Sequence, residues 1–232
     1  MKEKVLTYLD LGFIDYKEAW DIQKEIFSLR ISGGTSDVLL LLEHPNTYTL
    51  GKTANRQNLK GTDEYLKENQ ISVYDIDRGG DITYHGPGQL VGYPIIDLNS
   101  WYKDSHKYLR TLEEVIIRTC RHYNLMCERN AKYTGVWINN RKIAAIGVKI
   151  SHWVTMHGFA FNVNTNLKLF DGIIPCGIND KAVTSLKEEL NKDIDIQEVK
   201  LLLLKNFEEI FNYSETILKK REELLSSITI NV

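Results

Sequence analysis

A glycine-rich segment at residues 78–90 constrains the fold and the function of this chain more than any other part of its sequence. It reads Arg-Gly-Gly-Asp-Ile-Thr-Tyr-His-Gly-Pro-Gly-Gln-Leu, so that four glycines and one proline are interspersed with six polar or aromatic residues. This density of glycine and proline disfavours the interior of a helix or of a strand. We therefore expect a rigidly shaped loop that crowds these side chains together and holds a ligand.

The composition is that of an ordinary globular protein. The chain has 232 residues, of which 43% are hydrophobic, which is enough for one large domain with a buried core. Its 29 basic and 31 acidic side chains leave a formal net charge of -2. Because binding to nucleic acid or to an anionic membrane usually needs a large positive charge, we expect small molecules or a neutral to mildly acidic protein as partners.

The sequence carries no signal for a membrane or for export. The aliphatic runs at residues 38–42 and 201–204 are too short to span a bilayer, and the first residues lack the apolar core of a signal peptide. Three cysteines without paired C-x-x-C spacing fit neither a disulfide framework nor a zinc site. We therefore expect a cytoplasmic protein in a reducing environment.

Strand-like and helical apolar patterns follow one another in an uneven order along the chain. Because strict alternation of strands and helices is absent, they predict an α+β fold in which a mixed β-sheet packs against helices. Strands are expected at residues 5–13, 37–43, 72–77, 90–98, 135–138, 142–150 and 157–163. Helices are expected after Asp15, which forms a capping box with Glu18, and at residues 105–123, 196–211 and 217–225.

Two local signals refine this expectation. Pro94 removes a backbone donor from the strand expected at residues 90–98, which predicts a sheet edge or a bulge there. Asn139 and Asn140 tolerate positive φ and are expected to form the two-residue turn of a hairpin. Lys142 then lies at the very start of the strand that follows this turn.

Three further motifs accompany the glycine-rich segment. They are Leu42-Glu43-His44-Pro45 leading to Tyr48-Thr49-Leu50-Gly51, Gly135-Val136-Trp137 leading to residues 141–147, and residues 157–162 leading to Ile174-Pro175-Cys176-Gly177-Ile178. Together the four motifs resemble the signature of the lipoate-biosynthesis octanoyltransferases, or lipoyl(octanoyl) transferases, whose superfamily includes lipoate-protein and biotin-protein ligases. The resemblance covers residues 38–186. It implies a single catalytic domain over residues 1–232 with the lipoate/biotin-protein ligase-like fold and a C-terminal helical segment at residues 196–226.

The resemblance also implies a reaction, which is a step of protein lipoylation. An octanoyltransferase takes an octanoyl group from octanoyl-acyl carrier protein, holds it as a cysteine thioester and passes it to a specific lysine. The implied acceptors are the lipoyl domains of 2-oxoacid dehydrogenase complexes and the glycine cleavage H protein. Because the acyl group arrives already activated as a thioester, no metal ion, no ATP and no other cofactor is expected.

Cys176 and Lys142 are the catalytic candidates. A free cysteine is more often a small buried hydrophobe than a nucleophile, and Cys120 and Cys127 keep that interpretation. Cys176 lies between a proline and a glycine, where a constrained turn can expose its thiol, and the resemblance assigns the acyl-thioester to it. A thiol with a pKa near 8.5 is only about 3% thiolate at neutral pH, so a nearby cation is needed. The resemblance selects Lys142 for this role.

Histidines offer an alternative partner for the thiol, because imidazole is the commoner base beside a nucleophilic cysteine. His85 and His157 lie within the motifs and are expected in the substrate pocket, with a proton-transfer role left open for both. His44 has a weaker claim of the same kind. The remaining histidines, His106, His122 and His152, are expected at the surface or on helix faces.

Three of the motifs supply the substrate-binding residues that the resemblance implies. The small residues among them would leave a slot for an acyl chain, although tight packing is the commoner reason for small residues on strands. Full burial of an octanoyl tail contributes at most about 5 to 6 kcal/mol. The implied set is Arg78, Gly79, Gly80, Asp81, Ile82, Thr83, Tyr84, His85, Ala145, Ile146, Gly147, Gly158, Phe159 and Ala160, in which the role of Asp81 is open.

Two other functions remain open. An ATP-dependent lipoate or biotin ligase of the same fold would form an acyl-adenylate and would need no cysteine nucleophile. The basic glycine-rich loop expected of a biotin ligase is absent, as are the common dinucleotide and P-loop motifs, whereas Cys176 is in place. A non-catalytic lipoyl-domain or acyl-binding protein would keep only the pocket, and the presence of both Cys176 and Lys142 argues against it.

Overall fold

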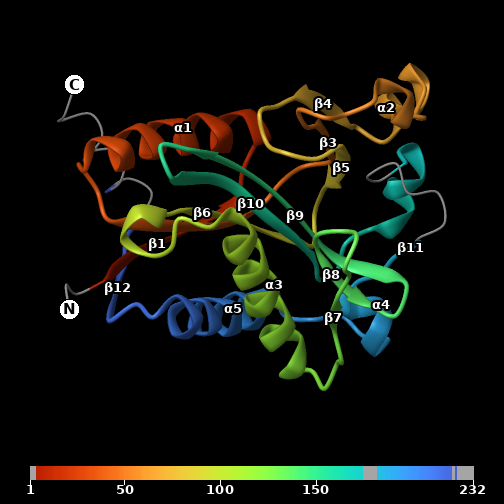
Figure 1. Cartoon of the computed structure of the whole chain (residues 1–232). Helices are drawn as coiled ribbons and strands as arrows, with labels where there is room; N and C mark the ends of the chain where they lie inside the picture. The colour runs from red at the N-terminus through yellow and green to blue at the C-terminus, as the bar shows by residue number, and fades with distance from the viewer. Residues whose placement is uncertain (1–3, 175–181, 221–222, 224–232) are drawn as a thin grey trace.

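Two β-sheets organise the structure, a computed structural model that describes residues 4–174, 182–220 and 223. The strands of the large sheet are β1 Val5–Phe13, β2 Asp37–Glu43, β6 Gln89–Ile95, β7 Glu128–Arg129, β8 Val136–Ile138, β9 Arg141–Ser151, β10 Val154–Asn162, β11 Ala182–Val183 and β12 Glu215–Leu218. They follow the order β12-β1-β2-β6-β10-β9-β8-β7, and β11 pairs with β9. This mixed sheet lies between helices on its two faces (Figure 1), which confirms the predicted α+β class.

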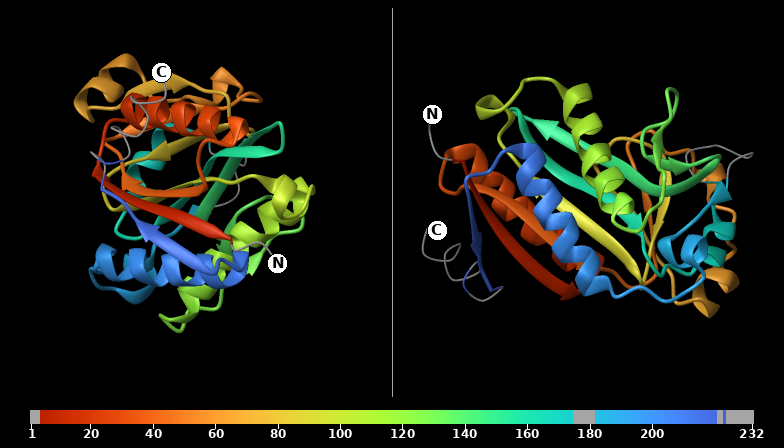
Figure 2. Two further views of the ribbon diagram at one scale, coloured as in Figure 1. Left: turned by 90° about the vertical axis from the view of Figure 1, so that its left-hand side faces the viewer. Right: turned by 90° about the horizontal axis from the view of Figure 1, so that it is seen from below.

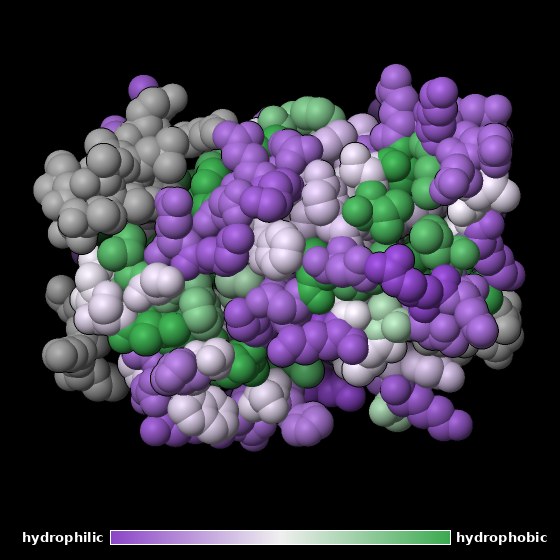
Figure 3. Space-filling view, turned by 90° about the horizontal axis from the view of Figure 1, so that it is seen from above, coloured by the Kyte–Doolittle hydropathy of each residue, from purple (hydrophilic) through white to green (hydrophobic). Residues whose placement is uncertain are grey.

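Helix α1, Tyr16–Ser32, covers one face of the large sheet. Asp15 caps the helix, because its carboxylate accepts hydrogen bonds from the backbone amides of Lys17 and Glu18. Gly33, with a φ of 78°, ends it in the left-handed conformation that glycine adopts without strain. The predicted helix start is therefore confirmed. Seen from above, the surface on this side of the molecule mixes hydrophilic and hydrophobic residues (Figure 3).

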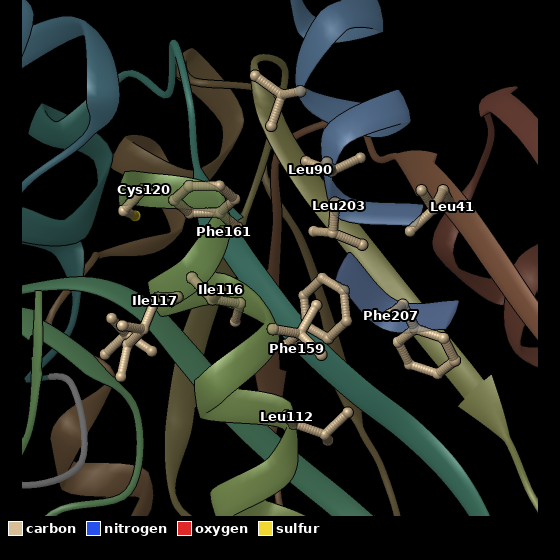
Figure 4. Close-up of a cluster of buried hydrophobic side chains, with 14 of the residues drawn as sticks. Leu41, Leu90, Leu112, Ile116, Ile117, Cys120, Phe159, Phe161, Leu203 and Phe207 are labelled. Carbon is tan, nitrogen blue, oxygen red and sulfur yellow. The ribbon is translucent and has the colours of Figure 1, made fainter. Parts of the chain in front are cut away.

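Helices α3, Ser105–Arg121, and α5, Ile196–Phe211, pack against each other and cover the opposite face of the sheet (Figure 2). Figure 4 shows how their apolar side chains meet strand β10, with Leu112, Ile116, Leu203 and Phe207 around Phe159 and Phe161. These six side chains are at most 2% exposed, and each such burial contributes about 1.5 to 3 kcal/mol. Both helices predicted for these regions are confirmed.

The helix predicted at residues 217–225 is wrong at residues 217–220, of which the first two belong to a strand, whereas Glu223 is helical. Asn212 ends α5 in the left-handed conformation, and Ser214 then donates its backbone N–H to the carbonyl of Lys4. This contact brings residues 215–218 alongside β1, where they form β12 in parallel pairing. The edge of β1 presents unpaired backbone groups, and residues 215–218 form hydrogen bonds with them. This pairing overrides the local helical pattern.

Pro94 lies in an interior strand, so of the two expected alternatives, a sheet edge or a bulge, the sheet edge is wrong. β6 pairs with β2 through Leu39 opposite Pro94, and it pairs with β10 only as far as Gly92 opposite Phe159. Beyond that point β10 is irregular, because His157 has a φ of 60°. The proline is tolerated because it lies in a gap of the β6–β10 pairing, which resumes at the Asp97–Val154 bridge, so it removes no pairing with β10.

The small sheet holds part of the glycine-rich segment. Its strands are β3 Thr47–Leu50, β4 Ser72–Asp75 and β5 Ile82–His85, in the order β4-β3-β5. The expectation of a loop throughout residues 78–90 is therefore wrong at β5. The glycines lie on either side of this stretch, and its own residues form a short strand that pairs with β3.

The remaining elements lie in the connections between the strands and helices described above. They are α2 Asp63–Glu68, α4 Leu186–Leu190 and the 3-10 helices η1 Arg56–Asn58, η2 Leu98–Ser100 and η3 Leu167–Gly172. Asn139 has a φ of 54° in the turn between β8 and β9, which confirms the predicted hairpin. In the described parts of the chain, no helix combines the length and the apolarity needed to cross a membrane.

Candidate active site

A cavity opens between the glycine-rich segment and strands β9 and β10. Its empty volume is about 540 Å³, part of which belongs to the open mouth. The predicted substrate-binding residues that line it are Arg78, Gly79, Gly80, Asp81, Ile82, Thr83, His85, Ala145, Ile146, Gly147, Gly158, Phe159 and Ala160, and Lys142 and His157 line it as well. Residues far apart in the sequence thus surround one volume, as the binding of a single ligand requires.

Tyr84 is the one member of that predicted set that does not line the cavity. Successive side chains of a strand point to opposite sides, so Thr83 and His85 face the cavity while Tyr84 faces the core of the small sheet. The Tyr84 hydroxyl donates a hydrogen bond of 2.9 Å to the Asn46 side-chain oxygen. Its ring meets Phe170 edge to face, with 5.2 Å between the ring centres. Tyr84 therefore packs the small sheet.

Lys142 is the second residue of β9 and is only 8% exposed. Its Nζ lies 4.8 Å from the centre of the Trp137 ring, within cation–π range. Lys142 also lines a smaller cavity, which shares Thr83, Lys142, Ala145 and Ala160 with the large one and adds Gln89, Asn162, Phe170 and Val183. A nearly buried cation therefore lies where the two cavities meet.

Cys176 lies outside the described residues, but both flanks of that stretch are described. On the N-terminal flank, Ile174 donates its backbone N–H to the carbonyl of Asn58 at 2.7 Å. On the C-terminal flank, Val183 of β11 pairs with Lys142 of β9. The chain that follows the cysteine-containing stretch therefore runs beside Lys142.

The other two cysteines have the environments that the sequence predicts. Cys120 is buried on α3, and Cys127 is half-buried just beyond that helix. A hydrogen bond with Cys127 and burial together raise the pKa of the Cys120 thiol well above its usual value. The thiolate of Cys120 is thereby disfavoured, which makes this thiol a poor nucleophile.

Arg78 and His85 belong to one hydrogen-bonded group beneath the cavity. Arg78 is 7% exposed and donates through one guanidinium nitrogen to the Thr49 carbonyl at 2.8 Å and to the Thr49 hydroxyl at 2.9 Å. The same hydroxyl lies 3.4 Å from Nε2 of His85, whose Nδ1 lies 2.9 Å from Oε1 of Gln89. Burial lowers the pKa of His85 well below its usual value, so this imidazole is neutral at pH 7.

His157 pairs with an acidic residue that sequence reasoning missed. Its Nε2 lies 2.7 Å from Oδ1 of Asp77, and Lys149 donates to the other carboxylate oxygen at 2.6 Å. Because a carboxylate only accepts hydrogen bonds, Nε2 of His157 carries the proton. The hydrogen bond from His157 and the one from Lys149 hold the pKa of Asp77 well below its usual range. Burial, together with the nearby charges of Arg78 and Lys149, lowers the pKa of His157 despite the opposing effect of Asp77, so His157 is neutral and Asp77 is charged.

An aromatic group lies at the side of the cavity that faces α1. Tyr16 stacks on His85 with 5.7 Å between ring centres and lies 4.9 Å from the ring of His44. The Nδ1 of His44 lies 2.9 Å from the carbonyl of Ile14, and its Nε2 lies 2.8 Å from the Tyr93 hydroxyl. Burial lowers the pKa of His44 to about 4, so it is neutral at pH 7. His44 supports the wall from behind, because it does not line the cavity itself.

The two glycines expected to leave a slot have different surroundings. A Cβ atom on Gly158 would lie 2.2 Å from the carbonyl oxygen of Gly92 and 2.6 Å from Cδ of Pro94. Gly158 therefore permits the close approach of β6 and β10. A Cβ atom on Gly147 would lie 3.0 Å from Cδ of Arg78, so a side chain there would press on the cavity wall.

Four cavity residues were not predicted from the sequence as pocket residues or as partners of pocket residues. Tyr16, Tyr93 and Thr134 line the cavity, and Asp77 holds His157 from beside it. The position of Asp77 next to Arg78 was a usable signal, since an acidic side chain at the edge of a ligand loop needs a partner. Tyr16 gave no such signal, because nothing local tells that the start of α1 faces the glycine-rich segment. The three histidines expected at the surface, His106, His122 and His152, are exposed.

Comparison with known proteins places the chain among acyl-handling enzymes. Residues 15–208 match the family model of the lipoyl protein ligase A/B catalytic domain. An octanoyltransferase of Christiangramia forsetii is 51% identical over 225 residues, covering 90% of this chain and 96% of that protein. An octanoyltransferase of Rubrobacter xylanophilus is 51% identical over 201 residues, covering 86% of this chain and 90% of that protein.

Solved structures agree on the fold. The protein Ta0514 from Thermoplasma acidophilum, described as a putative lipoate protein ligase, superposes with a TM-score of 0.75 at 17% identity over 99% of this chain and 94% of that one. A lipoate-protein ligase A bound with ATP superposes with a TM-score of 0.74 at 17% identity over 98% of this chain and 93% of that one. The chain belongs to the lipoyl protein ligase A/B catalytic domain family and, within it, to the octanoyltransferase family.

Proposed function

We propose that the protein transfers an octanoyl group from octanoyl-acyl carrier protein, through a thioester on Cys176, to a specific lysine of lipoyl domains or of the glycine cleavage H protein. Relatives of about half-identical sequence that are named octanoyltransferases support the acyl transfer. The observation that carries the proposal is the place of Lys142, which is nearly buried where the two cavities meet and is paired through its backbone with the chain that follows the Cys176 stretch.

The reaction has two acyl transfers that share one thioester. In the first, the Cys176 thiolate attacks the acyl carbon of the donor, a new C–S bond forms, the C–S bond of the donor breaks, and the departing thiolate takes up a proton from solvent. In the second, the amine of the acceptor lysine attacks the acyl-enzyme, a C–N bond forms, and the C–S bond to Cys176 breaks. The amine loses one proton, which Lys142 relays to solvent, and the thiolate is restored.

Lys142 acts first on the ionisation of the thiol. Lowering a thiol pKa from about 8.5 to about 6.5 makes the thiolate the majority form at neutral pH and needs about 2.7 kcal/mol. One ammonium group in a largely water-excluded site supplies an interaction of this size. The low exposure of Lys142 supports the assignment, because a solvated lysine would be screened. Such a free thiol also requires a reducing compartment, which is the reason to assign the protein to the cytoplasm.

The large cavity suits an unbranched acyl chain. Ile146 and Phe159 contribute to its wall, and Ala145 and Ala160 stand opposite each other in the β9–β10 pairing without filling the space between the strands and the glycine-rich segment. The same two alanines line the smaller cavity that contains Lys142. We infer that the tail occupies the large cavity and that the acyl carbon lies toward Lys142.

The decisive experiment is intact-mass spectrometry after mixing the protein with octanoyl-acyl carrier protein in the absence of ATP. An octanoyl adduct that neutral hydroxylamine removes is expected. Cys176→Ala abolishes the adduct and the transfer to a lipoyl domain, whereas Cys120→Ala and Cys127→Ala keep both. An adduct that survives Cys176→Ala would refute the assignment of the nucleophile.

The same assay separates the rival functions. An ATP-dependent ligase uses free octanoate or lipoate with ATP and does not turn over the carrier-protein thioester. A non-catalytic binding protein forms no adduct with either donor. Transfer from the thioester without any nucleotide is the result that both rivals forbid.

A further inference from the structure

Asp81 contacts both the cavity and a neighbouring segment of the chain. It lines the cavity, and its Oδ1 accepts hydrogen bonds from the backbone amides of Ile82 at 2.8 Å and of Asn55 at 3.1 Å. Its other carboxylate oxygen accepts a hydrogen bond from Nδ2 of Asn58. Residues 55–58 contain the short helix η1, so this one carboxylate fastens η1 to the glycine-rich segment.

The segment that Asp81 holds is the one against which the chain runs before Cys176. The carbonyl of Asn58 accepts the backbone N–H of Ile174 at 2.7 Å. Leu59 forms an antiparallel bridge with Ile173, and the amides of residues 60 and 61 both donate to the carbonyl of Gly172 at 2.9 Å. Residues 58–61 thus set the path of residues 172–174.

We propose that Asp81 is a positioning residue for the nucleophile, acting through Asn58 on the chain that leads to Cys176. A hydrogen bond from an amide to a carboxylate is stronger and more directional than one between neutral groups, which suits a role in fixing position. The contacts run from the cavity wall through Asp81 and Asn58 to Ile174, two residues before the proposed nucleophile. This inference rests on the proposed function of Cys176.

The amide and the carboxylate of the Asn58–Asp81 hydrogen bond can be exchanged between the two positions, which provides a test of the contact. Asn58→Asp places a second carboxylate against Asp81, so the hydrogen bond is replaced by repulsion. In the double variant Asp81→Asn/Asn58→Asp the partners are exchanged. The new amide oxygen at position 81 still accepts from the two backbone amides, and its NH₂ group donates to the carboxylate at position 58.

Asp75→Asn is the matched control. Asp75 also contacts η1, through a pair between its carboxylate and the Arg56 guanidinium, but the two side chains are 68% and 72% exposed. An exposed pair of this kind contributes little to position or stability. The control therefore removes one acidic contact of the same short helix without touching the route to Ile174.

The experiment measures the rate of octanoyl-Cys176 formation from octanoyl-acyl carrier protein in a single turnover, with the full chain. A misplacement on the order of 1 Å at a reacting group lowers a rate by up to about 100-fold. We expect Asn58→Asp to slow the reaction by roughly 10- to 100-fold at an unchanged KM for the donor, and we expect the double variant to recover most of the rate. Asp75→Asn reacts at the wild-type rate.

A second readout separates position from folding. The pH dependence of alkylation at Cys176, followed at peptide level with Cys127 as the internal reference, is expected to shift in Asn58→Asp and to return in the double variant, while the melting temperatures stay close. If Asn58→Asp fails to fold, Asn58→Ala removes the same side-chain contact without repulsion and is expected to slow acylation.

The outcomes distinguish the two proposals. A wild-type protein that forms no adduct at Cys176 refutes the proposed function and, with it, the role of Asp81. If the wild-type protein forms the adduct, two results refute the role of Asp81 alone. One is a double variant as slow as Asn58→Asp, and the other is an Asn58→Asp variant as fast as wild type.

Discussion

Replacing Gly158 with alanine tests whether this glycine serves the fold or the acyl slot. The added Cβ atom would lie 2.2 Å from the carbonyl oxygen of Gly92 and 2.6 Å from Cδ of Pro94. Both atoms belong to β6, an interior strand, so relief requires a shift of more than 1 Å between two central strands. Overpacking of this severity costs about 3 kcal/mol, the upper end of the usual range. For a chain of this size that lowers the melting temperature by about 6 to 12 °C.

Two other glycines of the cavity wall provide the comparison. A Cβ atom on Gly147 would lie 3.0 Å from Cδ of Arg78 and 3.0 Å from the carbonyl oxygen of Gly79, a milder overlap than at Gly158, so we expect a loss of about 1 kcal/mol. A Cβ atom on Gly79 would meet only the Val148 carbonyl, at an ordinary 3.4 Å, and we expect no loss of stability. Differential scanning calorimetry on the three alanine variants measures the series. A Gly158→Ala variant that melts within 1 °C of wild type would refute the reasoning from these contacts.

For three further substitutions the structure predicts the direction of the change in activity or stability. Lys142→Ala is expected to move the pH profile of Cys176 alkylation upward and to cut acyl transfer strongly with little change in melting temperature; an unchanged profile would assign the cation's role elsewhere. Asp77→Asn is expected to destabilise the protein at neutral pH, and the difference from wild type is expected to shrink as the pH falls below about 4, because the stability from a depressed carboxyl pKa is full above the unfolded pKa and is lost as the pH falls toward the folded pKa; urea titrations at several pH values measure this. Tyr84→Phe is expected to cost about 1 kcal/mol through the lost hydrogen bond and to retain acyl transfer; a large loss of kcat in a stable variant would place Tyr84 at the ligand.

The elements that the sequence predicted correctly have local causes. Asp15 caps its helix through the backbone amides of Lys17 and Glu18, and Asn139 turns a hairpin through its own φ. The elements that it missed depend on distant partners. Residues 215–218 form a strand because they pair with the edge of β1, and residues 82–85 form β5 because they pair with β3. No short window of the sequence contains either partner.

The candidate site divides in the same way. Three of the four motifs supplied the substrate-binding residues that the resemblance implied, and of these only Tyr84 packs the small sheet without lining the cavity. The pairing of His157 with Asp77 joins residues 80 positions apart, and the stacking of Tyr16 on His85 depends on how α1 packs on the sheet. Contacts of this kind depend on the tertiary fold, so the spacing of the motifs in the sequence does not predict them.

His85 and His157 remain as alternatives to Lys142 as the partner of the Cys176 thiol. The directions of the hydrogen bonds around them show which one has a nitrogen able to accept a proton. An arginine can only donate, so Thr49 accepts from Arg78 and turns its own hydroxyl proton toward His85 Nε2. The Gln89 side-chain nitrogen donates to the Asn162 side-chain oxygen at 2.9 Å, which leaves Gln89 Oε1 to accept from His85 Nδ1.

His85 is therefore neutral with its proton on Nδ1, and both of its nitrogens are engaged. A base in this state has no lone pair to offer a thiol, so His85 orients the cavity wall instead of deprotonating Cys176. His157 differs, because Asp77 fixes its proton on Nε2 and Nδ1 has no hydrogen-bond partner among the described residues. If Lys142→Ala leaves the alkylation profile of Cys176 unchanged, His157 is the only one of these two histidines with a nitrogen able to accept the proton.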